Sequence, residues 1–278
     1  MKNRNAEPLV SIIIPVYNSQ QTIQRCLQSI ADQTYKKIET IIVDRYSSDK
    51  TIQIAKQFNV KILRLNSERS LAKNFGAKKS SGKFLLFMDS DMELHPKTVE
   101  ECIVLCNEKN FDAVMIPETT IAYGFWARCR KHERDFYNND SNFFLMPRFF
   151  NKKTFLNVQG FDERLVLGED FDLARRYEKR GYHIGVATLP IKHIEGKLAL
   201  TKVILKAYYY GKSFVPFFFK NPTLTLRGYS PTRFVRNIKF LLKQPAYLFG
   251  ILVIKLLEYV SYAIGVFAYV LSHTIFLR

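Results

Sequence analysis

With 278 residues, the chain is long enough for one large α/β domain and an appendage, because compact domains usually have about 100 to 200 residues. Its composition, 47% hydrophobic and 24% charged residues, argues against a disordered chain. The 42 lysines and arginines outnumber the 25 acidic residues and give a formal charge of +17, so we expect an anionic partner: nucleotide phosphates, an acidic lipid surface or nucleic acid.

The N-terminal run from Leu9 to Val16 is apolar, but it is too short and too β-branched for a signal peptide. We therefore expect the catalytic part of the chain to stay in the cytosol. The four cysteines have neither CxxC spacing nor histidines at zinc-finger spacing, which favours reduced, buried thiols over a zinc site or a disulfide framework.

Short β-branched runs alternate with helical patterns through the first half of the chain. We expect strands at residues 9–15, 38–43, 60–63 and 84–88, and helices at residues 22–31, 49–58 and 70–79. This alternation predicts a mostly parallel, twisted sheet flanked by helices. In such folds the ligand crevice lies at the carboxyl ends of the strands, so polar side chains that follow the strands should gather there.

Three polar clusters follow these strands directly: Tyr17 with Asn18, Asp44, and the DXD triplet Asp89, Ser90 and Asp91. Two carboxylates fixed at the end of a strand suit Mg²⁺ or Mn²⁺ bridging a diphosphate, although acids at this place are equally common as helix caps. The carboxylate after the second strand is likewise either an N-cap or an acceptor of hydrogen bonds from a base or ribose.

The helix expected near residue 70 carries Arg69, Lys73 and Asn74. These side chains are candidate donors to phosphates or sugar, and they would equally make an ordinary solvated basic face. Further along, a glycine turn delivers Glu169 and Asp170 to the start of a helix expected at residues 169–180. One of these acids is a candidate general base, although acids at a helix start also complement the helix dipole.

Beyond residue 117 the pattern becomes irregular, and we expect the aromatic and basic stretch at residues 123–150 to form the acceptor side. His193, which follows an expected strand at residues 184–187, is a candidate third metal ligand, although a lone histidine is more often structural. Between residues 191 and 245, one acid, Glu195, accompanies eleven basic residues: Lys192, Lys197, Lys202, Lys206, Lys212, Lys220, Arg227, Arg233, Arg236, Lys239 and Lys243.

This basic run precedes an apolar tail at residues 246–277. A basic run beside an apolar helix is typical of binding to the cytoplasmic leaflet, whereas a nucleic-acid binder needs a recognisable module, which the sequence lacks. The tail exceeds the roughly 20 residues that a membrane span requires, and Lys255 and Glu258 are spaced to pair on one helix. We expect a transmembrane or re-entrant helix, with an interfacial helix or a buried soluble helix as alternatives.

Taken together, these segments resemble the family 2 glycosyltransferases of the GT-A fold, which are inverting and use nucleotide sugars. The matching segments cover nearly all of residues 9–194 in the expected order: VSIIIPVYN from Val10, IIVDRYSSDKT from Ile41, AKNFGA from Ala72, FLLFMDSDMELHP from Phe84, and QGFDERLVLGEDFDLARRYEKRGY from Gln159. The resemblance implies a GT-A catalytic domain at residues 1–197, with a nucleotide-sugar half at 9–117 and an acceptor half at 118–197. Residues 198–278 would form a basic, amphipathic and membrane-associated region.

By this resemblance, Asp44 contacts the nucleotide base, Asp89 the ribose and Asp91 the metal, while His193 reaches the metal or the diphosphate and Asp170 is the catalytic base. The other donor-binding candidates are Pro15, Tyr17, Asn18, Arg69, Lys73, Asn74 and Ser90. The candidates for the acceptor side are Glu169, Trp126 and Arg134, of which the last two lie in a stretch without a match to the family.

Two positions depart from the family pattern. Arg45 stands where the family commonly has a second acid, so recognition of the base and ribose is expected to differ from the usual UDP pattern. Gln159 replaces the first of two glycines before Phe161, which is expected to narrow the acceptor-side turn.

The sequence therefore predicts an inverting transferase at the cytoplasmic face of the cell membrane, in which Mg²⁺ or Mn²⁺ at Asp91 neutralises the leaving diphosphate and Asp170 takes a proton from an acceptor hydroxyl. The acceptor would be a lipid-linked or cell-envelope saccharide. A polyprenyl phosphate is the main alternative, because it is already anionic and needs no base. A metal-dependent nucleotidyltransferase is a more distant alternative, and a catalytically dead binding module is disfavoured because none of the acids is lost.

Overall fold

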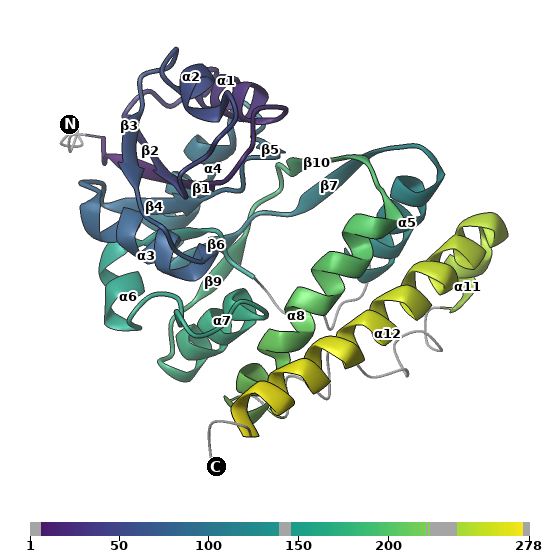
Figure 1. Ribbon diagram of the computed structural model, residues 1–278. Coiled ribbons are helices and arrows are strands. Elements are labelled where there is room, and N and C mark those ends of the chain that lie inside the picture. The colour runs from purple at the N-terminus through teal and green to yellow at the C-terminus, as the bar shows by residue number, and fades with distance from the viewer. Residues whose placement is uncertain (1–6, 139–145, 221, 223–237, 275–278) are drawn as a thin grey trace. The chain divides into compact units, whose positions relative to one another are not determined.

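The computed structural model describes residues 7–138, 146–220, 222 and 238–274 (Figure 1). The chain divides into two compact units, and both are discontinuous in sequence. The first unit comprises residues 1–119, 144–163 and 169–194, and the second unit comprises residues 120–143, 164–168 and 195–278. The second unit thus includes residues 120–143, which the sequence division assigned to the acceptor half of the catalytic domain.

A seven-stranded sheet of order β3-β2-β1-β4-β8-β6-β9 forms the centre of the first unit. All neighbouring pairs are parallel except those made by β8, which runs antiparallel to both β4 and β6. The predicted, mostly parallel sheet is therefore confirmed. The strands are β1 (Val10–Val16), β2 (Ile38–Asp44), β3 (Lys61–Arg64), β4 (Phe84–Phe87), β6 (Ala113–Met115), β8 (Phe149–Asn151) and β9 (Ile184–Val186).

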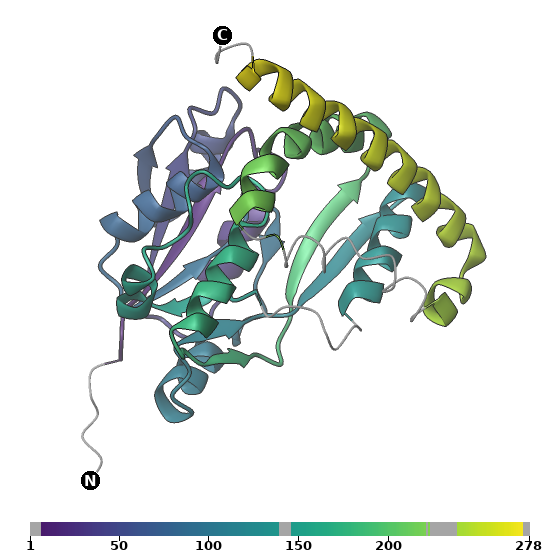
Figure 2. The ribbon, with the colours of Figure 1, turned by 90° about the horizontal axis from the view of Figure 1, so that it is seen from below.

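Helices cover both faces of this sheet (Figures 1 and 2). Alternate residues of a strand point to opposite faces, so Ile12 and Ile14 of β1 join one apolar cluster while Ile13 joins another. Burial on both faces explains why the parallel strands read as continuous apolar runs. The helices are α1 (Ile23–Ala31), α2 (Thr51–Ala55), α3 (Arg69–Lys79), α4 (Thr98–Glu108), α6 (Lys152–Asn157) and α7 (Glu169–Lys179).

A second, three-stranded sheet of order β5-β10-β7 brings distant parts of the chain to the DXD turn. Its strands are β5 (Met92–Glu93), β7 (Glu118–Tyr123) and β10 (Ile191–Lys197). The β5–β10 pair is antiparallel, with His193 opposite Met92. Strands β7 and β10 each continue from the first unit into the second.

The second unit is built from α5 (Phe125–Asn138), α8 (Leu200–Lys220), α11 (Ile238–Leu242) and α12 (Pro245–Thr274). Helices α8 and α12 lie side by side (Figure 2). Two glycines permit their close approach, because a Cβ atom at Gly211 would lie 2.2 Å from the Tyr262 carbonyl oxygen and one at Gly265 would lie 2.2 Å from that of Tyr208.

Within the described part of the chain, one helix is long and apolar enough to cross a membrane: α12, over Pro245–Ser272. The predicted pair inside it forms, with Lys255 Nζ 3.0 Å from Glu258 Oε2. All four cysteines are free and buried, as expected. Three members of the predicted basic run, Arg227, Arg233 and Arg236, lie outside the described residues.

Candidate active site

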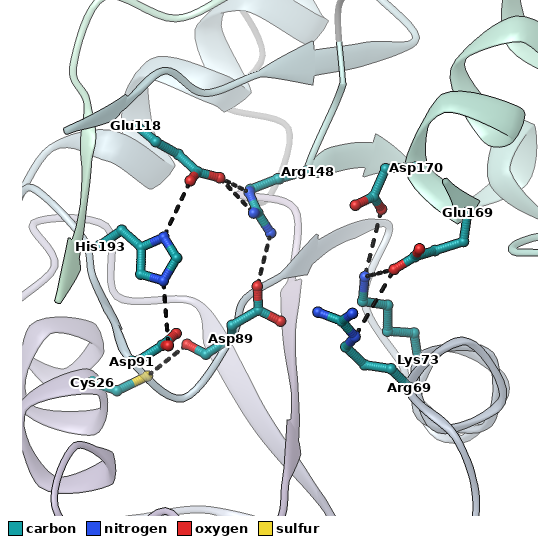
Figure 3. Close-up of polar contacts among 10 residues, drawn as sticks. All are labelled: Cys26, Arg69, Lys73, Asp89, Asp91, Glu118, Arg148, Glu169, Asp170 and His193. Carbon is teal, nitrogen blue, oxygen red and sulfur yellow. Dashed lines mark hydrogen bonds and ion pairs between the residues drawn. The ribbon is translucent and has the colours of Figure 1, made fainter. Parts of the chain in front are cut away.

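Five titratable side chains, three acids with an arginine and a histidine between them, line the end of β4 in the first unit (Figure 3). Arg148 donates from Nε to Glu118 Oε1 at 2.9 Å, and its Nη1 lies 3.6 Å from Asp89 Oδ2. On the other side, Glu118 Oε2 lies 3.5 Å from His193 Nδ1, and His193 Nε2 lies 3.3 Å from Asp91 Oδ2. A continuous chain of charged contacts thus links the two aspartates of the DXD triplet.

Strand pairing places these residues together. The triplet follows β4, and the antiparallel strand β8 starts beside its end, where the Phe87 amide donates to the Arg148 carbonyl at 2.9 Å. The β5–β10 pairing brings His193 to the same turn, and the Ile194 amide donates to the Asp91 carbonyl at 2.9 Å. The predicted meeting of Asp89, Asp91 and His193 therefore occurs.

The sequence analysis did not single out Arg148 or Glu118 as members of this site. Burial by itself would raise the pKa of Glu118, but the Arg148 guanidinium and His193 hold that pKa well below its usual range. Asp89 follows the same logic, because burial would raise its pKa but the charges of Arg148, Lys73 and Arg69 together lower it. Both carboxylates are therefore ionised at neutral pH, and each has its charge opposed by the same half-buried guanidinium.

Asp91 is the acid of this group that is best suited to hold a divalent ion. Its Oδ1 atom is buried and has no hydrogen-bond partner among the described residues, while its Oδ2 atom contacts His193. Mg²⁺ is usually bound by one or two carboxylates together with substrate phosphates, so Asp91 and His193 fit an ion whose remaining ligands are donor oxygens and water. In the described ranges, no three or more His, Cys, Asp or Glu residues are grouped closely enough to hold a metal by themselves.

A second charged cluster joins α3 to the start of α7. Lys73 Nζ lies 3.5 Å from Asp170 Oδ1 and 3.6 Å from Glu169 Oε1, and Arg69 Nε lies 3.9 Å from the same glutamate oxygen. The Lys73 side chain is only 2% exposed and also lies over the ring of Phe161 at 4.6 Å. The structure thus brings two predicted donor-side cations together with the two acids at the start of α7, a grouping that the sequence analysis did not predict.

The two acids at the start of α7 differ in their surroundings. Glu169 is buried, and burial together with the negative charge of Asp170 raises its pKa. The Asp170 side chain is 33% exposed, so solvent and an acceptor hydroxyl can reach it. Asp172, two residues after Asp170, is buried and accepts a hydrogen bond from Arg176 Nε at 2.8 Å. Of these three acids, Asp170 alone combines an accessible carboxylate with a buried neighbouring cation, Lys73.

Asn74, predicted to bind the donor, holds the turn before α7. Its side chain donates to the Phe161 carbonyl at 2.8 Å and accepts from the Phe161 amide at 2.9 Å. The preceding residue pair has left-handed backbone angles, with φ of 66° at Gln159 and 63° at Gly160. A glutamine in this region is strained, because its Cβ atom approaches its own carbonyl, so the departure from the family's glycine has a local conformational cost.

Asp44 is fully buried at the end of β2. Its Oδ1 accepts from the Ser47 amide at 3.0 Å, and its Oδ2 lies 3.7 Å from Arg64 Nε. Asn18 connects this turn to the end of β1, since its amide donates to Ser47 Oγ at 3.0 Å and its side chain accepts from the Ser48 amide at 2.9 Å.

The remaining donor-side candidates lie along the same edge of the sheet. Tyr17 is exposed, and the Arg45 guanidinium lies 5.8 Å from the centre of its ring. Pro15 is half-buried near the end of β1. Ser90 donates to Ser19 Oγ at 2.8 Å. The ends of β1, β2 and β4 therefore share one polar edge.

The two acceptor-side candidates without a family match lie on α5 in the second unit. Trp126 packs edge-on against Phe125, with ring centres 5.0 Å apart, and joins that unit's apolar cluster. Arg134 Nη2 lies 2.7 Å from Glu195 Oε2. Trp126 therefore packs against the apolar cluster of the second unit, whereas Arg134 forms an ion pair in that unit.

Comparison with known proteins identifies the family. Residues 11–162, more than half of the chain, match the family described as "Glycosyl transferase family 2". Glycosyltransferase AglE of Haloferax volcanii is 38% identical over 116 residues, which are 38% of this chain and 38% of AglE. An uncharacterized glycosyltransferase of Rickettsia bellii is 32% identical over 190 residues, which are 60% of this chain and 27% of that protein. The chain thus spans less than two fifths of either relative.

A solved structure shows the same fold. The crystal structure of Staphylococcus aureus TarS 1-349 in complex with UDP-GlcNAc is 20% identical and gives a TM-score of 0.57, covering 87% of this chain and 79% of that chain. This likeness confirms the predicted GT-A architecture of an α/β fold with a mostly parallel sheet. The family match, which covers more than half of the chain, shows that the chain belongs to glycosyl transferase family 2.

Proposed function

We propose that this glycosyltransferase is inverting and moves a sugar from a nucleotide-diphosphate sugar to a hydroxyl of a lipid-linked or cell-envelope saccharide. The observation that carries this proposal is the contrast at the start of α7, where an accessible Asp170 lies beside the buried cation Lys73 and the buried acid Glu169. A general base needs an accessible, ionised carboxylate within reach of the proton that it removes.

The donor side supports a nucleotide diphosphate. Structures of TarS contain UDP or UDP-GlcNAc, and this chain has the same fold. A diphosphate near Asp89 and Asp91 requires positive charge, which Arg148 supplies in part, although two carboxylates already share it. When bound by Asp91 and His193, Mg²⁺ or Mn²⁺ would supply the further charge that stabilises the leaving diphosphate.

The proposed reaction is an in-line displacement. The acceptor oxygen bonds to the anomeric carbon as the bond from that carbon to the diphosphate oxygen breaks, and the hydroxyl proton moves to the Asp170 carboxylate. Lys73 orients this carboxylate, because its ammonium group is fixed by burial and by the ring of Phe161. The free nucleoside diphosphate leaves with the bonding electrons, and the configuration at the anomeric carbon inverts.

We further propose that α12 binds the cytoplasmic face of the cell membrane and lies in the plane of the lipid surface. On the side that packs within the second unit, Glu258 pairs with Arg130 of α5 and Lys255 pairs with Glu133 of the same helix. Lys255 and Glu258 also pair with each other. A spanning orientation would require this network to break or to enter the bilayer with α5. The other side of α12 exposes a continuous apolar row at helical spacing: Phe249, Leu252, Leu256, Tyr259, Val260, Ile264, Phe267 and Leu271.

Product analysis tests the reaction. The protein is incubated in turn with a panel of nucleotide sugars, Mn²⁺ and a lipid-linked saccharide extract. We expect free nucleoside diphosphate and a product of inverted anomeric configuration by NMR. Release of inorganic pyrophosphate would instead indicate nucleotidyl transfer, and a retained configuration would contradict the proposed displacement. Transfer to a polyprenyl phosphate rather than to a sugar hydroxyl would identify the alternative acceptor.

Vesicle flotation tests the membrane proposal. Leu252→Glu with Ile264→Glu places charge on the exposed row of α12 and should abolish flotation with vesicles that contain anionic lipid. Leu156→Glu, at an exposed leucine of α6 in the first unit, is the matched control and should float normally. If full-length protein stays soluble without detergent and does not float, the membrane proposal is wrong.

A further inference from the structure

The second unit contains a cavity of about 500 Å³ between side chains of α5, β10, α8 and α12. Three of the residues around it are glutamates. Six are basic: Arg130, Arg134, Lys197, Lys202, Lys206 and Lys255. Six positive charges against three negative charges leave the cavity with a net charge of +3.

The glutamates are already paired with the cations of the cavity wall. Arg130 lies 2.7 Å from Glu133 and 2.5 Å from Glu258, and Lys255 also contacts both acids. Glu195 lies 2.7 Å from Arg134, as described above. Buried ion pairs of this kind usually stabilise a fold no better than apolar packing, so stability alone does not explain why this wall is charged.

The excess positive charge comes from Lys197, Lys202 and Lys206. All three are exposed, and none has an acidic partner among the residues that the structure describes. Lys202 and Lys206 are four residues apart on α8, so their like charges face the same side and repel each other. A bound anion would relieve this repulsion.

We propose that this cavity binds a phosphate or diphosphate group of the acceptor. Lysines are common phosphate ligands, and the cavity has the size of a small-molecule site. The inference rests on the proposed function, because a lipid-linked saccharide carries phosphate between its lipid and its sugar. The same chemistry would recognise a soluble acceptor with a phosphate ester.

Calorimetry with inorganic pyrophosphate tests the site. The full-length protein in detergent is titrated in chelator, where the carboxylates beside Asp91 have no metal to attract the probe. Lys202→Ala with Lys206→Ala should weaken binding by about tenfold or more, because it removes two of the three unpaired positive charges that the proposed anion would contact. Lys212→Ala with Lys243→Ala, which removes the same charge from exposed lysines outside the cavity, should change the affinity by less than about twofold. Equal weakening in the two double variants, or no pyrophosphate binding by the unaltered protein, would overturn the proposal.

Vesicle binding separates the two phosphate sources. Phosphatidylcholine vesicles are compared with and without a polyprenyl diphosphate, using both double variants. Extra retention that is lost only with the cavity lysines identifies a lipid source, whereas pyrophosphate binding without such retention identifies a soluble one. Nucleotide binding with Mn²⁺ is measured alongside and should be equal in all variants. Its loss in the cavity variant would overturn the proposal, while its absence in every protein, including the unaltered one, would refute the proposed function instead.

Discussion

Replacing Arg148 by methionine should destabilise the first unit strongly at neutral pH. The guanidinium contacts Glu118 at 2.9 Å and Asp89 at 3.6 Å, and its removal leaves two half-buried carboxylates without this shared cation. Breaking a buried pair by removing one partner usually costs about 3 to 5 kcal/mol. Because both acids remain partly exposed, we expect a loss of about 3 kcal/mol, or a decrease in Tm of about 6 to 12 °C for a unit of this size.

The effect should depend on pH with a definite sign. Arg148 lowers the folded-state pKa of both acids, so the stability that it contributes is present above their unfolded pKa values of about 4 and is lost as the pH falls through the folded values. The difference between Arg148→Met and the unaltered protein should therefore shrink progressively below about pH 4.

Hydrogen exchange of peptides from β4 and β8, measured between about pH 2 and pH 7 with correction for intrinsic rates, gives the stability of the first unit on both sides of the expected change. Tryptophan fluorescence is unsuitable, because the single tryptophan, Trp126, lies in the second unit. Arg45→Met is the control, since Arg45 forms an exposed pair with Glu68 at 3.3 Å and its loss should cost less than about 1 kcal/mol. Equal losses at the two arginines, or a loss at Arg148 that is constant across the pH range, would refute the described electrostatics.

Three further predictions concern single positions. Asp170→Asn should lower the rate of single-turnover transfer by about 100-fold or more, while the affinity for the donor stays nearly unchanged. The control Asp172→Asn should mainly lower Tm, because it weakens the contact with Arg176. A donor-binding defect in Asp170→Asn would contradict the role of Asp170 as base. Asp91→Ala should abolish the increase in nucleoside diphosphate affinity that Mn²⁺ produces in calorimetry, and undiminished binding in chelator would argue against a metal. Gln159→Gly should be neutral or stabilise by up to about 1 kcal/mol in urea unfolding, because relief of the left-handed strain offsets the entropy of a more flexible unfolded chain; a clear loss of stability would show that no strain is present.

The donor edge was predictable because its residues follow strands that alternate regularly with helices. Asp44, Asp89 and Asp91 each come directly after an apolar run, and parallel strands place such positions along one edge. Glu169 and Asp170 were recognisable from the glycine turn before α7. Their contact with Lys73 was not derivable from spacing, since α3 and α7 are separated by nearly 100 residues and meet only through packing on the sheet.

Arg148 and Glu118 were missed for a physical reason. Strand β8 is three residues long and antiparallel within a sheet whose sequence pattern indicates parallel strands. A strand of three residues is too short to show a hydrophobic periodicity that identifies its neighbouring strand. The sequence pattern therefore did not place Arg148 beside the DXD turn. The PRFF segment, a basic residue before two large aromatic residues, was the only available signal.

The orientation of α12 was also open at the level of sequence. The composition predicted an apolar helix long enough to cross a membrane, and the spacing of Lys255 and Glu258 predicted an ion pair between them. Whether that pair faces lipid or protein depends on Arg130 and Glu133, which lie more than 100 residues earlier and supply the opposing charges. Ion pairs between residues distant in the sequence, rather than hydropathy, therefore determine which side of α12 packs against α5.

The two units use charge in opposite ways, and this difference bears on what each can bind. In the first unit, Arg148 contacts Asp89 and Glu118, and Lys73 contacts Glu169 and Asp170. Asp91 keeps an Oδ1 atom without a hydrogen-bond partner among the described residues, and the Asp170 side chain is partly exposed, as the proposed metal and proton-transfer roles require. In the second unit, glutamates neutralise the arginines of the wall, so that the lysines around the cavity keep positive charge available for an anion. An enzyme that joins a diphosphate-activated donor to a phosphate-bearing acceptor requires both, because the reacting oxygen must lose a proton while the phosphates on either substrate must be held by cations.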